Sequence, residues 1–162
     1  AKMMGLGYPG GGVIGETALA GDPDRIQFPR ARLPGFDFSF SGIKTAVNRY
    51  LQDHSRRWSD EIPDIAAGFQ EAVIEVLTEK VVAAALEKGC GHVALVGGVA
   101  ANARLRESVS RAAEEKGIAI HIPSLLLCGD NAAMIAAAGY HHLAAGERSA
   151  LADDVYSRTP IR

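Results

Sequence analysis

The chain has 162 residues, the length of one domain, and with 48% hydrophobic and 22% charged residues it can bury a core of ordinary size. Its formal net charge of -2 provides no global positive field, so any contact with nucleic acid would have to be local. No stretch approaches the run of about 18 apolar residues that spans a bilayer, and the two cysteines, Cys90 and Cys128, lack CxxC spacing, which favours a reduced, cytoplasmic setting.

The first residues combine glycines with a helical pattern. Residues 5–10 formally match the dinucleotide fingerprint GxGxxG, but no strand precedes them and Pro9 interrupts the match. We therefore expect the three glycines at 10–12 to form a loop that opens a helix over 13–20. A plain connector is the alternative interpretation of this loop.

An aromatic segment and a short amphipathic pattern follow. Residues 36–41 alternate aromatic and small polar side chains with period two, which predicts a half-buried strand with one aromatic face. Residues 43–51 carry apolar residues at helical spacing, and the serine before them can cap that helix. Lys44 and Arg49 lie on its polar side, where they form either a solvated face or a nucleic-acid contact.

The longest helical pattern covers residues 63–87, which we expect to be a scaffold. Three of its glutamates, Glu71, Glu75 and Glu79, recur every four residues. Because residues four apart are neighbours on one helix face, this spacing predicts a single solvated acidic stripe.

The most informative stretch is residues 91–102. An apolar strand over 93–96 leads into Gly97 and Gly98, and a helix over 102–116 begins directly after them. Paired glycines allow the backbone to approach a ligand closely, and the first amides of a helix point toward it. This order is typical of a turn that holds a phosphate or a nucleotide.

A second strand and turn follow. Residues 118–122 predict a strand in which His121 lies on a sheet face rather than serving as a ligand, because no partner stands at metal spacing. Asp130 precedes a helix over 132–140, where it is either an N-cap or a metal ligand at the end of a strand. The alternation of strands and helices predicts an α/β fold with a parallel or mixed sheet.

Six blocks of the sequence, taken in order, resemble the universal tRNA threonylcarbamoyladenosine transferase family. They are YPGG at 8–11, FPR at 28–30, DFSFSGIKT at 37–45, AAGFQ at 66–70, GGVAANARLR at 97–106 and CGDNAAMIA at 128–136. The resemblance implies an actin-like ATPase fold. Residues 1–162 would form a single α/β domain, the C-terminal half of a two-domain protein, with a mixed sheet flanked by helices and the N-terminal half absent.

The resemblance also implies an activity and its site. The family transfers a threonylcarbamoyl group from threonylcarbamoyl-AMP to the N6 amine of the adenosine beside the anticodon of tRNAs that read ANN codons. Gly11 and Asn102 match nucleotide contacts, and the amides of Gly97 and Gly98 are suited to hold the adenylate or ATP. Asp130 matches one ligand of an iron or zinc ion, whose two histidine ligands, an HxxxH pair, have no match here.

Partners and departures follow from the same resemblance. It implies tRNA, for which Lys44 and Arg49 are candidate contacts, a paralogous actin-like subunit and a small P-loop ATPase of the same pathway, with no membrane partner. Gly12 stands where the family usually has proline, and Gly129 where it usually has threonine, so both loops are less constrained. Apolar surface left exposed in a half-protein would favour a homodimer.

We expect the chain by itself to be inactive, because two metal ligands and one wall of the nucleotide cleft are missing. The alternative function is a non-catalytic, actin-like scaffold that partners the transferase. Such a scaffold would lack the aspartate at 130 and the complete GGVxAN block, both of which this chain has. A small-molecule kinase of the same superfamily is disfavoured by the SFSGIKT block.

Overall fold

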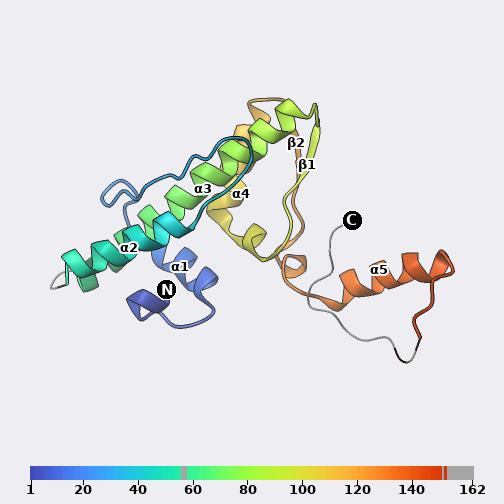
Figure 1. Ribbon diagram of the computed structural model, residues 1–162, viewed down its shortest axis with the longest axis horizontal. Coiled ribbons are helices and arrows are strands. Elements are labelled where there is room, and N and C mark those ends of the chain that lie inside the picture. The colour runs from blue at the N-terminus through green and yellow to red at the C-terminus, as the bar shows by residue number, and fades with distance from the viewer. Residues whose placement is uncertain (56–57, 151, 153–162) are drawn as a thin grey trace. The chain divides into compact units, whose positions relative to one another are not determined.

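The computed structural model describes residues 1–55, 58–150 and 152, which divide into a first compact unit, residues 1–129, and a second unit that begins at residue 130. The expected single domain over residues 1–162 stays a prediction, and most of the tail after residue 150 lies outside the described residues. The first unit contains, in order, α1 (Gly10–Ala18), α2 (Ser41–Asp53), α3 (Ile62–Glu87), β1 (His92–Ala94), α4 (Ala103–Glu114) and β2 (Ala119–His121) (Figure 1). The second unit contains α5 (Ala132–Ala144).

The α/β class predicted from the sequence is confirmed. The strands β1 and β2 run parallel, with His92 opposite Ala119 and Ala94 opposite His121, and α4 connects them. A parallel pair needs a crossover of this kind, usually a helix. Within the described ranges the sheet has these two strands only, so the larger mixed sheet that the family resemblance implies is not formed there.

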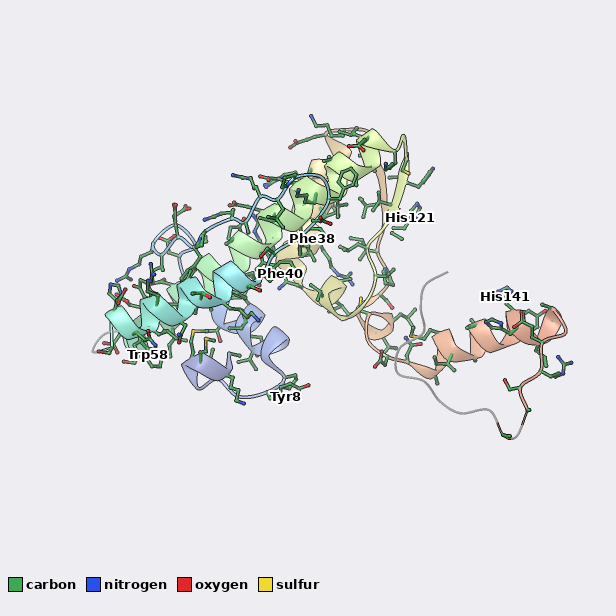
Figure 2. All side chains as sticks on the ribbon, in the orientation of Figure 1. Tyr8, Phe38, Phe40, Trp58, His121 and His141 are labelled. Carbon is green, nitrogen blue, oxygen red and sulfur yellow. The ribbon has the colours of Figure 1, made fainter. Side chains whose placement is uncertain are left out.

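The strand predicted over residues 36–41 is wrong. Residues 36–40 lie in a loop, and α2 begins at Ser41, which is the first residue of the helix rather than its cap. Phe38 and Phe40 stack on each other with ring centroids 6.0 Å apart and remain partly exposed (Figure 2). An alternating pattern forms a strand only where a neighbouring strand pairs with its backbone, and none lies beside this segment.

The long helix α3 organises the first unit. Its N-terminal half packs with α1, α2 and the segment around Phe28 into one hydrophobic cluster, and its C-terminal half packs against α4 and the strands (Figure 1). Gly68 makes the first cluster possible, because a Cβ at this position would collide with the carbonyl oxygen of Ile26. The helix predicted over 63–87 is confirmed with a shift of one residue at its start.

The packing of α4 on α3 combines apolar and polar contacts. Val109 of α4 is completely buried, and Leu105 is nearly so. A buried hydrogen bond of 3.0 Å joins Thr78 Oγ1 to Ser108 Oγ across the two helices. Buried hydroxyl groups that pair in this way avoid the penalty of lost hydration, so α3 holds α4, and with it the turn before α4, in a fixed position.

The structure corrects the predicted start of α1 and identifies the capping residue of α5. The helix α1 begins at Gly10, so the glycines expected in a loop form its first turn. In the second unit, Asn131 rather than Asp130 caps α5, because its side-chain oxygen accepts a hydrogen bond of 3.0 Å from the Met134 amide. None of the helices in the described part of the chain is both long and apolar enough to cross a membrane.

Candidate functional site

A cavity of about 460 Å³ in the first unit brings together three of the predicted ligand-binding residues. Gly11 from α1, and Gly98 and Asn102 from the turn before α4, line it, together with Gln70 of α3. Gly97 adjoins this lining at the start of the turn. Residues that are far apart in the sequence therefore converge on one concave surface, which is the usual form of a small-molecule site.

The side chain of Asn102 is held at both ends of its amide group. Its Oδ1 atom accepts a hydrogen bond of 2.9 Å from the amide of Leu105, which makes it the N-cap of α4. Its Nδ2 atom donates to Oε1 of Gln70 at 2.7 Å. A side chain fixed at both ends of its amide is preorganised for a ligand.

The backbone at Gly97 explains why this turn contains glycine. Gly97 has φ 87°, a left-handed conformation that other residues adopt only with strain. One turn of 3-10 helix, Gly98–Ala101, follows, and the amide of Ala100 donates to the Gly97 carbonyl at 3.0 Å. Nη2 of Arg106 donates to the carbonyl of Pro123 at 2.8 Å, so the start of α4 is tied to the segment after β2.

The first turns of two helices line the same cavity. Gly11 and Gly12 belong to the first turn of α1, and Ala103 and Arg104 to that of α4. The first amides of a helix have no partners within it and carry the positive end of its dipole. The cavity therefore offers two helix N-termini to an anionic or oxygen-rich ligand.

The charged residues that line this cavity are Arg104 and Glu16, and Arg104 is compensated by an ion pair within the protein. Arg104 forms a bidentate ion pair with Glu71, with Nη2 to Oε1 at 2.6 Å and Nε to Oε2 at 3.0 Å, and both side chains are partly buried. Bidentate pairs of this kind are fixed in geometry. The cavity therefore has an ordered polar wall near Arg104, while the exposed side chains of Leu19 and Val99 supply an apolar one.

The solvated acidic stripe predicted on α3 is wrong. Glu71, Glu75 and Glu79 each pair with an arginine that lies far away in the sequence: Arg104, Arg30 and Arg32, respectively. The hydrogen bonds from Arg30 lower the pKa of Glu75, and those from Arg32 lower the pKa of Glu79. The spacing of the glutamates correctly predicted one shared face, but the partners come from long-range packing that a local pattern does not contain.

Lys44 and Arg49 do not form a single patch. Both are exposed on α2, but Lys44 lines a cavity of about 260 Å³ with Val47 and Phe69, whereas Arg49 lines another of about 450 Å³ with Asp53 and Tyr50. Residues five apart on a helix point in different directions. Their role in binding tRNA stays a prediction.

Asp130 lies at the start of the second unit and is exposed. Its neighbour Asn131 caps α5, so the N-cap role considered for Asp130 is not realised. Among the described residues no three His, Cys, Asp or Glu side chains converge on a point that could hold a metal ion. The described residues therefore do not by themselves form a complete iron or zinc centre, and Asp130 stays a predicted single ligand.

The structure gives His121 a partner that the sequence spacing did not reveal. His121 lies on the exposed face of the strand pair (Figure 2), and its Nε2 atom is 3.1 Å from Nδ1 of His92 on β1. The placement on a sheet face is confirmed, and the pair arises because parallel pairing brings the two strands together.

Sequence reasoning missed Gln70 and Gly15 as parts of the cavity. A Cβ at Gly15 would lie 3.6 Å from Asn102 Nδ2 and 3.7 Å from Gln70 Oε1, which are ordinary van der Waals distances, so Gly15 of α1 faces the two amides. The available signal for Gln70 was a polar residue two positions after the buried run 64–68 of α3. Such a residue needs a hydrogen-bond partner, but the sequence could not identify Asn102 as that partner.

Comparison with known proteins relates the chain to one family. The family model described as tRNA N6-adenosine threonylcarbamoyltransferase matches residues 1–137. Proteins of that name are 48% identical over 161 residues in Desulforapulum autotrophicum (98% of this chain, 48% of the relative), 50% over 149 in Symbiobacterium thermophilum (91% and 44%) and 46% over 161 in Salinibacter ruber (96% and 48%). The chain thus spans about half the length of these relatives.

Proposed function

The chain belongs to the tRNA N6-adenosine threonylcarbamoyltransferase family, and from this premise we propose that it supplies one wall of the nucleotide site of such a transferase. The observation that supports this function is the convergence of Gly11, Gly98 and Asn102 on one cavity. The ligand would be the adenylate part of threonylcarbamoyl-AMP, or ATP. The acceptor would be the N6 amine of the adenosine beside the anticodon of tRNAs that read ANN codons.

The chemistry of the cavity suits the adenylate. Its phosphate would lie at the first turns of α1 and α4, where amides of Gly11 and Ala103 are available. The ligand would gain hydrogen bonds from neutral donors, because Arg104 is already paired with Glu71. A site built in this way orients a charged ligand through backbone geometry rather than through a surplus of positive charge.

We further propose that the chain adopts the C-terminal half of an actin-like ATPase fold and contributes half of an active site. Asp130 would supply one ligand of an iron or zinc ion, and the remaining ligands would come from outside this chain. The proposed partners are tRNA, a paralogous actin-like subunit and a small P-loop ATPase. The non-catalytic scaffold is the second candidate, and the presence of Asp130 and of the complete GGVAAN block favours the transferase over it.

Equilibrium binding of ATP to the native protein tests the proposed function. We compare the wild type with Asn102→Asp, which keeps the oxygen that caps α4 but loses the amide donor, and with Asn48→Asp on the exposed surface of α2 as the matched control. The loss of one ligand hydrogen bond is expected to weaken binding by about tenfold in Asn102→Asp. Equal affinity in all three proteins would contradict the assignment of this cavity.

A further inference from the structure

Gln70 lines the cavity beside Asn102, and we infer that its amide nitrogen is a ligand contact that donates to oxygen atoms of the bound nucleotide. The inference rests on the proposed function, which it extends by naming a residue and the chemistry that it recognises. Gln70 would also position Asn102, so that the two amides act as one unit.

The orientation of both amides follows from one backbone group. The N–H of Leu105 can only donate, so the Asn102 atom that lies 2.9 Å from it must be Oδ1. Nδ2 of Asn102 therefore faces Gln70, and a donor facing a side-chain amide at 2.7 Å requires the oxygen Oε1. The two amides are thus oriented by α4 itself, and neither can be exchanged end for end without losing a hydrogen bond.

This fixed orientation determines what the cavity offers to a ligand. With Oε1 of Gln70 occupied, its Nε2 group keeps two N–H donors, and in the part of the chain that the structure describes no protein atom accepts from them. No buried side-chain nitrogen or oxygen among the described residues lacks a partner, so this group is accessible rather than sealed. Gln70 lines the cavity of about 460 Å³ and also an adjoining one of about 350 Å³.

The free groups of the pair are mainly donors. Gln70 contributes the two N–H groups of Nε2, and Asn102 retains one N–H of Nδ2. Donors that converge on one cavity select a ligand with acceptor oxygens, as the ribose and phosphates of a nucleotide have. Gly15 of α1 faces the pair, and a Cβ added there would lie in ordinary van der Waals contact with both amides.

The variant Gln70→Glu separates ligand contact from a purely structural role. Glutamate keeps an oxygen that accepts from Asn102, so the coupling to α4 is retained, but it replaces the N–H donors by an acceptor. We expect the Kd for ATP of the native protein, measured by calorimetry, to rise about tenfold or more, with the melting temperature within about 2 °C of the wild type. Gln52→Glu on the exposed face of α2 is the matched control and should bind ATP as the wild type does.

Gln70→Met, which is similar in length but has no N–H donor, provides a second variant in case glutamate disturbs the fold. It should show the same rise in Kd, and unchanged affinity in either Gln70 variant overturns the inference. Asn102→Asp distinguishes failure of the Gln70 contact from failure of the proposed function. If Asn102→Asp weakens binding and the Gln70 variants do not, the inference fails and the proposed function stands, whereas wild-type affinity in all three variants contradicts both.

Discussion

Gly68 is a residue whose missing side chain determines how the first unit packs. The carbonyl of Ile26 occupies the space that a Cβ would need, and Phe28 lies beside it in the hydrophobic cluster. The obstacle is backbone rather than a flexible side chain, so it cannot move aside without displacing the segment that precedes Pro29. The sequence block AAGFQ thus carries a packing requirement as well as the cavity residue Gln70.

Gly68→Ala is expected to destabilise the protein. Overpacking against backbone costs about 3 kcal/mol or more in the free energy of unfolding, which thermal or urea unfolding measures. Gly42→Ala, near the start of α2 with no atom within 4 Å of the added Cβ, is the matched control and should be neutral or slightly stabilising. Similar effects of the two substitutions would show that α3 does not approach Ile26 in this way.

Gly97→Ala tests the turn of the cavity. Because Gly97 has φ 87°, alanine at this position would lower the free energy of unfolding by about 1–2 kcal/mol. We expect a loss of stability of that size and weaker binding of ATP, because the turn that carries Gly98 and Asn102 would shift. Gly91→Ala, where the added Cβ meets nothing within 4 Å, should leave ATP affinity unchanged. Unaltered ATP affinity in Gly97→Ala would show that this turn is not part of the ligand site.

Among the helices, α3 holds the segment before α2 through ion pairs and hydrogen bonds. Arg30 binds Glu75 at 2.6 Å, Arg32 binds Glu79 at 2.7 Å, and Lys80 Nζ donates to the carbonyl of Leu33 at 2.5 Å. The Arg30 pair is the more shielded, because the Arg30 side chain is only 19% exposed, compared with 61% for Arg32. Exposed pairs contribute little, so Arg30 and Glu75 should dominate the attachment of the segment.

The stabilising effect of Glu75 should depend on pH. The hydrogen bonds from Arg30 lower its pKa in the folded state below the ordinary value of 4.5. A carboxyl group with a depressed folded pKa contributes stability that is fully present above about 4.5 and is lost as pH falls through the folded pKa. The melting temperature of Glu75→Gln should therefore lie below that of the wild type at pH 7, and the difference should shrink below pH 4.

The control for this pH series is Glu87→Gln, since Glu87 makes only an exposed contact of 3.5 Å with Lys88. Its melting temperature should follow the wild type at every pH. A difference between Glu75→Gln and the wild type that stays constant down to pH 3 would contradict the ion pair with Arg30.

The elements that the sequence predicted well are those whose signal is local. The periodicity of α3 and the glycine turn at Gly97 follow from spacing. The order of strands and helices predicted a parallel or mixed sheet, and β1 and β2 pair in parallel. The predicted strand over 36–41 failed because a strand needs a neighbour, and the acidic stripe failed because its arginines come from distant segments. Gln70 was missed for the same reason, since its partner Asn102 is 32 residues away.

For the molecule as a whole, the proposed function makes the chain one wall of a nucleotide site. It spans about half the length of its relatives, and the cavity that collects the predicted nucleotide residues is bordered by exposed Leu19 and Val99. Among the described residues no group of three potential ligands forms a metal centre.

The 162-residue chain by itself is therefore expected not to transfer a threonylcarbamoyl group to tRNA. The assay supplies threonylcarbamoyl-AMP and an ANN-reading tRNA transcript and measures modified adenosine by mass spectrometry of the digested tRNA. One of the relatives named above, at its full length, is the positive control. Modified adenosine produced by the chain alone would show that it holds a complete active site.

If the first turns of α1 and α4 hold the nucleotide, hydrogen exchange of the native protein will change there when ATP binds. Bound ATP should slow exchange of the amides at residues 10–15 and 98–105, which line the cavity, and leave α2 unchanged. Protection confined to α2, or none at residues 98–105 under saturating ATP, would contradict the account.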